Sequence, residues 1–323
     1  MEISLIIPVF NLEKYIEKCL ISLENQTFKN FEAIIVNDGS TDSSKQIIEE
    51  FTAKNSNFRL INTENCGVWS ARNRAIDEAR GDYIVFLDGD DYIAPDYLKK
   101  LYASAVEGGA DIAVCSAQNV DQSGNVINEN ENKVEGKTVF LKDEASVLLC
   151  YPAPWGKIFK AELFEGLRFP KCSKYEDLRL IPKLFLRASK VVFIPDKLYY
   201  YVTRKGSAMN GMAAEENLEI ISALKDLTEY FKENIIYKKY KSEIEFLVIK
   251  HIAVSALTRV ALTDDKKKRE VLNTISCYLN SFESLYKNKY IKTLSLNKKI
   301  ILFLNRKKLY FITRILMQLK SRE

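Results

Sequence analysis

Short apolar runs alternate with longer amphipathic stretches in the first third of the chain, and this alternation is the strongest constraint on its fold. Because neighbouring parallel strands must be joined by crossover connections, such alternation is typical of α/β proteins. It predicts a mostly parallel, doubly wound sheet, continued by a strand at 111–117. The strands are expected at 3–9, 31–37, 58–62 and 82–88, and the helices at about 13–25, 42–53 and 67–79.

The rest of the chain changes character. Polar residues with two glycines predict a hairpin or a mobile loop at 118–137, and 143–205 is mixed. Beyond residue 215 the periodicity is helical throughout. We expect one domain over 1–210 and a helical C-terminal region over 211–323. Its helices are predicted at about 215–234, 239–263, 266–282 and 297–320.

Charge is unevenly spread. Residues 1–110 carry 11 basic and 18 acidic side chains, whereas residues 222–323 carry 22 basic and 10 acidic ones. This asymmetry predicts an acidic, metal-dependent site near one end and a basic docking surface near the other. The basic residues form no recognised nucleic-acid motif, so we expect no nucleic-acid partner.

Cysteine usage and hydropathy indicate the compartment. The six cysteines include no CxxC pair, which argues against a zinc site or a disulfide framework and suits a reducing cytosol. No signal peptide is evident, and no run approaches the ~18 apolar residues of a spanning helix. We therefore expect a cytoplasmic protein.

Each strand of the first third ends in a distinctive polar turn. Since the carboxyl ends of parallel strands share one sheet edge, these turns should converge on one crevice. Buried strand-end carboxylates need a compensating ligand, and a hard divalent cation, Mg²⁺ or Mn²⁺, would serve. In chain order the turns are Pro8-Val9-Phe10-Asn11, Asn37-Asp38-Gly39-Ser40-Thr41-Asp42, Asn65-Cys66-Gly67 and Asp88-Gly89-Asp90-Asp91, with Ala71-Arg72-Asn73 on the helix after the third.

These motifs, PVFN, VNDGSTDSS, NCGVWSARN and FLDGDD, resemble in this order the family 2 glycosyltransferases of the GT-A fold, of the bacterial surface-polysaccharide type. Downstream, Lys174-Tyr175-Glu176-Asp177-Leu178 resembles the acceptor-side ED motif of that family. Leu198-Tyr199-Tyr200-Tyr201, Arg204 and Ser207 resemble the segment that often follows it. The resemblance covers about residues 1–210, and implies a nucleotide-sugar half at 1–117 and an acceptor half at 118–210.

The resemblance also implies residue roles. Asp38 would accept the imide N–H of uracil, and Phe10, between Pro8 and Asn11 in the same nucleotide-binding turn, would lie against the base. Arg72 falls where a cation can reach the nucleotide.

Asp88 and Asp90 form the DxD pair. Asp88 would bind the ribose or a metal-bound water, Asp90 would bind the metal, and Asp177 would be the general base. On the acceptor side we place Glu176, which would face away from Asp177, together with Trp155 and Lys157. Aromatic rings suit sugar faces, although a buried tryptophan is more often part of a core.

The expected function is metal-dependent, inverting transfer of a sugar, from a UDP-sugar, to a glycan or polyprenyl-linked glycan acceptor. The acids fit this chemistry, because a bound cation neutralises the leaving diphosphate and a carboxylate can deprotonate the acceptor hydroxyl. One alternative is a nucleotidyltransferase, although PVFN lacks its glycine- and basic-rich phosphate loop. Another is a catalytically degenerate subunit that binds a nucleotide-sugar, although the acids are intact.

The C-terminal tail is basic and amphipathic. Residues 297–323 contain eight basic side chains and one acidic one, with apolar residues at three- and four-residue steps. Such a helix can lie in a membrane interface, which predicts a peripheral enzyme on the inner face of the membrane. The alternative is a terminal helix packed on the catalytic domain with its charges in solvent.

Overall fold

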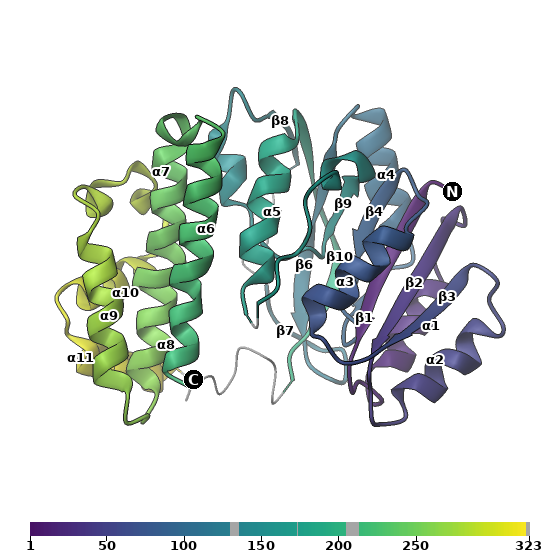
Figure 1. Cartoon of the computed structure of the whole chain (residues 1–323), viewed down its shortest axis with the longest axis horizontal. Coiled ribbons are helices and arrows are strands. Elements are labelled where there is room, and N and C mark those ends of the chain that lie inside the picture. The colour runs from purple at the N-terminus through teal and green to yellow at the C-terminus, as the bar shows by residue number, and fades with distance from the viewer. Residues whose placement is uncertain (130–135, 173, 205–212, 321–323) are drawn as a thin grey trace. The chain divides into compact units, whose positions relative to one another are not determined.

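The computed structural model describes residues 1–129, 136–172, 174–204 and 213–320. The chain divides into two compact units, Met1–Lys205 and Gly206–Glu323. The first unit is built around a mixed sheet, and the second consists of helices (Figure 1).

Ten strands form the sheet of the first unit. The main path has the order β3-β2-β1-β4-β9-β6-β10-β5, with β7 beside β6 and β8 beside β10. The strands are β1 (Ile3–Val9), β2 (Phe31–Asp38), β3 (Phe58–Thr63), β4 (Tyr83–Phe86), β5 (Tyr92–Ile93), β6 (Ile112–Val120), β7 (Val126–Glu129), β8 (Lys137–Phe140), β9 (Lys157–Lys160) and β10 (Lys190–Val202).

The first four predicted strands pair in parallel, as the alternating sequence requires. In the register of β1 and β2, Val9 lies opposite Asn37, and Asp38 of β2 lies opposite Thr63 of β3. The carboxyl ends of these strands therefore meet at one edge. The crossovers between them are α1 (Ile16–Glu24), α2 (Ser44–Thr52) and α3 (Val68–Glu78).

The later part of the first unit contains an antiparallel strand, β9, that the sequence did not reveal. β9 lies between β4 and β6 and is antiparallel to both, so it joins two groups of parallel strands. The predicted hairpin at 118–137 is present in part: β7 pairs antiparallel with β6, and 130–135 lie outside the described residues. Two further helices, α4 (Tyr97–Glu107) and α5 (Glu176–Arg187), complete this unit, with 3₁₀ turns at Ala145–Leu149 and Ala161–Phe164.

The helical unit follows the predicted order with one correction. The expected single helix at 297–320 is two helices, because Lys308 has a left-handed backbone with φ 57° and ends the first of them. The elements are α6 (Glu219–Glu233), α7 (Tyr237–Val248), a π-helix (Ile249–Ala256), α8 (Leu257–Leu262), α9 (Lys268–Asn280), α10 (Leu296–Arg306) and α11 (Tyr310–Lys320), with 3₁₀ turns at Glu215–Leu218, Leu285–Lys287 and Lys289–Thr293.

Candidate active site

The turns that end β1 and β2 are tied together. The Asn11 backbone N–H donates to Ser40 Oγ over 3.0 Å, and the Thr41 N–H donates to Asn11 Oδ1 over 2.8 Å. Gly39 has a φ of +72°, and a Cβ there would lie 2.8 Å from the Asn65 nitrogen, so the β3 turn packs directly on it. Three of the polar turns singled out in the sequence thus form one continuous surface.

On this surface Pro8 is buried and Phe10 is exposed. Asp38 is almost fully buried, and its two carboxylate oxygens accept hydrogen bonds from the backbone. The Cys66 N–H donates to Oδ1 over 3.0 Å, and the Gly67 N–H donates to Oδ2 over 2.8 Å. Asp38 therefore fixes the loop that leads into α3. This structural role is additional to its predicted contact with uracil.

The residues of the turn Asp88-Gly89-Asp90-Asp91, which follows β4 and Leu87, lie in different environments. Asp91 is buried and accepts hydrogen bonds from the Tyr199 hydroxyl, over 2.6 Å, and from the Val202 N–H, over 2.7 Å. The Tyr199 oxygen also accepts a hydrogen bond from the Asp88 N–H. Asp91 and Tyr199 thus hold the turn against β10, while Asp88 and Asp90 remain partly exposed.

Arg72 connects the turn after β4 with the start of α5. Its guanidinium donates to Asp88 Oδ1 over 2.9 Å and to Glu176 Oε1 over 2.8 Å. The side chain is buried, lies over the Phe169 ring, and leaves its Nε without a hydrogen-bond partner in the structure. The family resemblance predicted that the Arg72 cation can reach the nucleotide. In the structure this cation pairs with two acids that are 88 residues apart in the chain.

Asp177 lies in the first turn of α5, directly after Glu176, and is half-buried. Burial and the negative charge of Glu176 raise its pKa to about 7, although the Leu178 N–H and the charge of Arg72 act in the opposite direction. A carboxyl group with a pKa near neutrality can take up and release a proton under physiological conditions.

Asp90 pairs with Arg204, which is not among the predicted site residues. Arg204 Nε donates to Asp90 Oδ2 over 2.6 Å, and its guanidinium lies over the Tyr15 ring. Burial and the charge of Asp88 raise the pKa of Asp90, whereas Arg204 lowers it. Arg204 follows the tyrosine run Tyr199–Tyr201 in the sequence, and the fold brings its side chain to Asp90.

A divalent cation suits this pair of acids. Asp88 and Asp90 offer carboxylate oxygens, the ligands that Mg²⁺ and Mn²⁺ prefer, on a partly exposed turn. Among the described residues, no group of three or more histidine, cysteine, aspartate or glutamate side chains is arranged to hold a metal ion. A cation here would therefore take most of its remaining ligands from water or substrate phosphates.

Trp155 and Lys157 are core residues in this structure. The Trp155 ring stacks on Tyr199 with a centroid distance of 4.7 Å. Lys157 is buried, which lowers its pKa, and its Nζ donates to the Ala153 carbonyl over 2.8 Å. Their predicted contact with an acceptor stays a prediction, and their burial counts against it.

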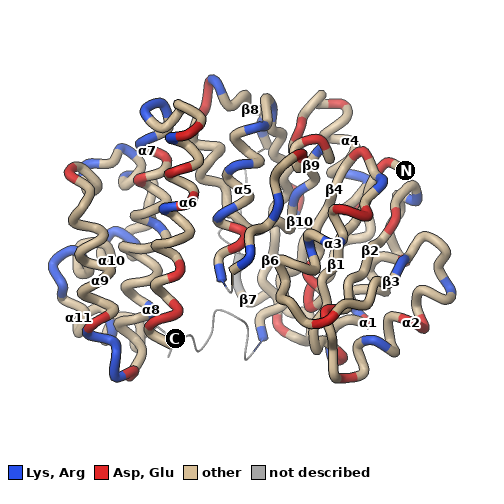
Figure 2. The backbone as a smooth tube through the Cα atoms, viewed as in Figure 1, with Lys and Arg blue, Asp and Glu red and all other residues tan. Residues whose placement is uncertain are grey.

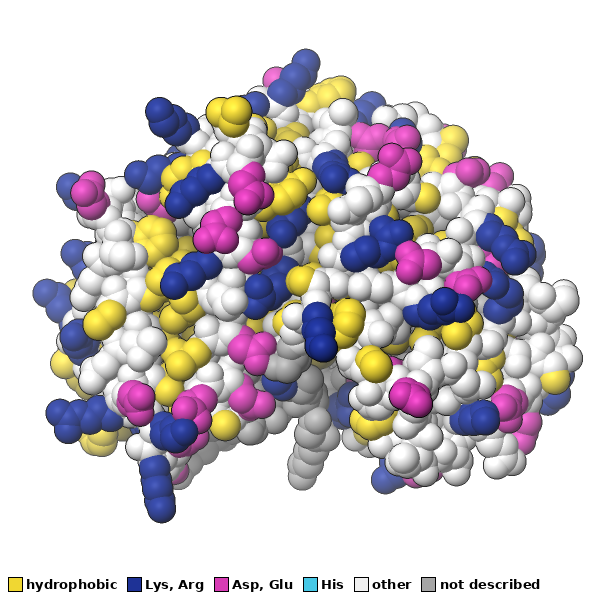
Figure 3. All heavy atoms as spheres, in the orientation of Figure 1, with side chains coloured by type: hydrophobic (Ala, Val, Ile, Leu, Met, Phe, Trp, Pro, Cys, Tyr) yellow, Lys and Arg dark blue, Asp and Glu magenta, His cyan; other side chains and the backbone are white. Residues whose placement is uncertain are grey.

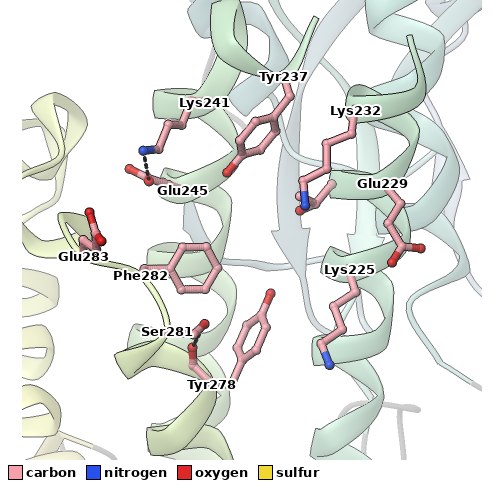
Figure 4. A pocket seen from close by; sticks show the side chains of 11 residues that line it. Lys225, Glu229, Lys232, Tyr237, Lys241, Glu245, Tyr278, Ser281, Phe282 and Glu283 are labelled. Carbon is pink, nitrogen blue, oxygen red and sulfur yellow. Dashed lines mark hydrogen bonds and ion pairs between the residues drawn. The ribbon is translucent and has the colours of Figure 1, made fainter. Parts of the chain in front are cut away.

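A cleft of about 390 Å³ lies within the helical unit, and none of the predicted site residues line it (Figure 4). Lys225 lies over the Tyr278 ring, Lys232 lies over the Tyr237 ring, and Lys241 pairs with Glu245. These three lysines therefore already contact aromatic rings or an acid of the same unit.

The sequence and structure resemble known proteins. The family model described as "Glycosyl transferase family 2" matches residues 4–168. Two relatives come from Streptococcus pneumoniae serotype 4. "Glycosyltransferase GlyA" is 38% identical over 225 residues, which span 64% of this chain and 31% of GlyA. "Glycosyltransferase GlyG" is 33% identical over 250 residues, which span 72% of this chain and 79% of GlyG.

A solved structure resembles the whole chain. It is the crystal structure of S. aureus TarS 1-349 in complex with UDP-GlcNAc, with a TM-score of 0.75 and 23% sequence identity. The match covers 99% of this chain and 92% of that one. At this identity the likeness concerns the fold, and it confirms the predicted α/β architecture of the GT-A type.

Proposed function

This chain belongs to glycosyl transferase family 2, and we propose that it transfers a sugar from a UDP-sugar to a glycan or polyprenyl-linked glycan, with inversion at the anomeric carbon. The proposed setting is assembly of a bacterial surface polysaccharide at the inner face of the membrane. The observation that carries the proposal is the bridge from Asp88 through Arg72 to Glu176. The bridge supports the proposal because it connects Asp88 with Glu176, the residue that precedes the candidate base Asp177.

The donor is proposed to lie on the surface formed by the β1, β2 and β3 turns. The exposed Phe10 ring offers a flat apolar face for a base. Asp38 would support the nucleotide by fixing the Cys66–Gly67 backbone and by offering its remaining lone pairs to the uracil imide. The complex of TarS with UDP-GlcNAc supports a UDP-sugar as the donor class.

Asp90 and Asp88 would hold a Mg²⁺ or Mn²⁺ ion, which when bound neutralises charge on the leaving diphosphate. The raised pKa of Asp90, caused by burial and by the negative charge of Asp88, supports this assignment, because a bound cation would offset both effects. Arg204, which already lies against Asp90, would place a second positive charge beside the diphosphate.

Asp177 is proposed to take the proton of the acceptor hydroxyl as that oxygen attacks the anomeric carbon. The bond from this carbon to the diphosphate oxygen breaks on the opposite face, which inverts the configuration. Since Arg72 pairs with Glu176, Asp177 is the member of the two adjacent acids that is left to act as base. Its pKa of about 7 suits proton transfer near neutral pH.

The test is acceptor-dependent turnover. The purified full chain would be incubated with a panel of UDP-sugars and with glycan or polyprenyl-linked acceptors, in Mn²⁺, in Mg²⁺ or with a chelator. We expect release of UDP that requires both acceptor and cation. If calorimetry shows donor binding but no acceptor releases UDP, a degenerate binding subunit is the better description.

A further inference from the structure

Each of the last two helices carries apolar side chains that are exposed to solvent. On α10, Leu296, Ile300 and Phe303 follow one another at helical spacing, and Leu296 is 73% exposed. On α11, Phe311 is 75% exposed. We call this the terminal face; its residues are Leu296, Ile300, Phe303, Leu309, Phe311, Ile312, Ile315, Leu316 and Leu319.

The opposite side of these helices is anchored in the helical unit. Asn305 is buried, and its Nδ2 donates to the Ala253 carbonyl over 2.9 Å. Thr313 Oγ1 donates to Asn305 Oδ1 over 3.1 Å, which joins α11 to α10. Arg314 forms an ion pair with Asp264. The terminal face is therefore held in place by polar contacts behind it.

The segment of the sequence that contains these helices carries only basic charged side chains, and Arg314 within it pairs with the exposed Asp264 outside it. Residues 284–322 contain eleven lysine and arginine side chains and no aspartate or glutamate. Arg306, the last residue of α10, and Lys307 and Lys308, in the connection to α11, are all exposed. Basic positions occur at several points of these helices in Figure 2, and Figure 3 shows apolar side chains together with charged ones of both signs on the visible face of the helical unit.

We propose that the terminal face binds the surface of an anionic lipid bilayer. Apolar side chains flanked by lysine and arginine suit the boundary between acyl chains and headgroups. Each basic residue close to anionic lipid adds affinity that salt screens. Among the described residues, no helix is both long and apolar enough to cross a bilayer. A second copy of the chain is a poorer occupant, because pairing two terminal faces would bring like charges together.

The test is co-sedimentation of the full chain with vesicles of phosphatidylcholine alone and of phosphatidylcholine mixed with phosphatidylglycerol. We expect binding to the mixed vesicles at low salt. F303S/F311S should lower the partition coefficient about tenfold or more, because two exposed rings no longer enter the interface. K307Q/K308Q should lower it several-fold and weaken its salt dependence.

Two control variants match these changes elsewhere. V126S/I127S replaces two exposed apolar residues of β7, and K54Q/K99Q replaces two exposed lysines of the first unit. Both should bind as the unaltered chain does, and all four variants should keep its thermal midpoint. Equal binding by F303S/F311S, or no binding by the unaltered chain at low salt, would overturn the proposal. So would a concentration-dependent dimer that F303S/F311S abolishes. Sedimentation is independent of turnover, so it separates this proposal from the catalytic one.

Discussion

Arg72 controls the charge around the candidate base. Because its guanidinium lowers the pKa of Asp177, Arg72→Gln should raise that pKa above its value of about 7. More of the base would then be protonated at neutral pH, so the midpoint of the kcat/KM profile should move to higher pH. Arg74→Gln is the control, since Arg74 lies on the same helix but pairs with Glu78 in solvent. An unchanged midpoint in Arg72→Gln would contradict this account.

Asp177 itself should affect chemistry more than binding. Below pH about 7 the carboxyl group keeps its proton and cannot accept another, so activity should rise with pH through that value. Asp177→Asn should lower transfer by about 10²–10⁴-fold and abolish this rise, with donor affinity retained. Calorimetric titration with a UDP-sugar provides the comparison. Loss of donor affinity instead would show that Asp177 is misassigned.

The neighbours Asp90 and Asp91 should respond differently to the same change. Asp91→Asn replaces one acceptor oxygen by an amide donor beside Tyr199 or Val202, and should lower the thermal midpoint. Asp90→Asn should leave the midpoint nearly unchanged and lower cation-dependent turnover by about 10²-fold or more. Thermal unfolding and turnover of both variants would test the pair. The assignment fails if Asp90→Asn retains normal turnover in the presence of chelator.

At the scale of the elements, the break between α10 and α11 can be tested by the sign of the change in free energy of unfolding when Lys308 is replaced by glycine. Lys308 has a left-handed backbone, which costs an L-residue roughly 1–2 kcal/mol and glycine almost nothing. Lys308→Gly should therefore raise the free energy of unfolding by about 1 kcal/mol. In one continuous helix the same substitution would lower it by about 1 kcal/mol. Lys307→Gly, at a φ of −82°, should bring no gain; chemical denaturation would measure both.

The sequence predicted the elements that depend on local pattern. The first four strands and their crossovers follow from short-range alternation, and their shared edge follows from parallel pairing. The antiparallel strand β9 could not be inferred this way, because four residues have no distinctive period and their place depends on distant partners. The break at Lys308 was hidden as well, since no glycine marks it.

For the site residues as well, the sequence predicted what depends on local pattern and missed what depends on distant partners. That Asp38, Arg72, Asp88 and Asp90 would gather at one edge could be predicted from their positions after strands. Their individual partners could not. The pairing of Arg72 with Glu176 depends on where α5 begins, and that of Arg204 with Asp90 depends on the end of β10. Burial of Trp155 against Tyr199 likewise depends on tertiary packing.

For the whole molecule, the two units should separate donor binding from membrane binding. All the residues proposed to bind the donor lie in the first unit, which has its own apolar core around β1 and its neighbours. A chain ending at residue 205 should fold and bind a UDP-sugar within a few-fold of the full chain, but should not sediment with anionic vesicles. Calorimetry and sedimentation would measure the two properties. A folded 1–205 chain without donor affinity would show that the helical unit contributes to the nucleotide site.

The bridge formed by Arg72 also has a consequence for the binding of two substrates. Under the proposed donor site, a ribose that competed with Arg72 for Asp88 would weaken one of the two contacts of this guanidinium. Donor occupancy would then alter the charge that an acceptor hydroxyl meets at Asp177, and thermodynamic reciprocity requires the acceptor to alter donor affinity equally. The dissociation constant of each substrate should therefore depend on whether the other is bound, and Arg72→Gln should weaken that dependence.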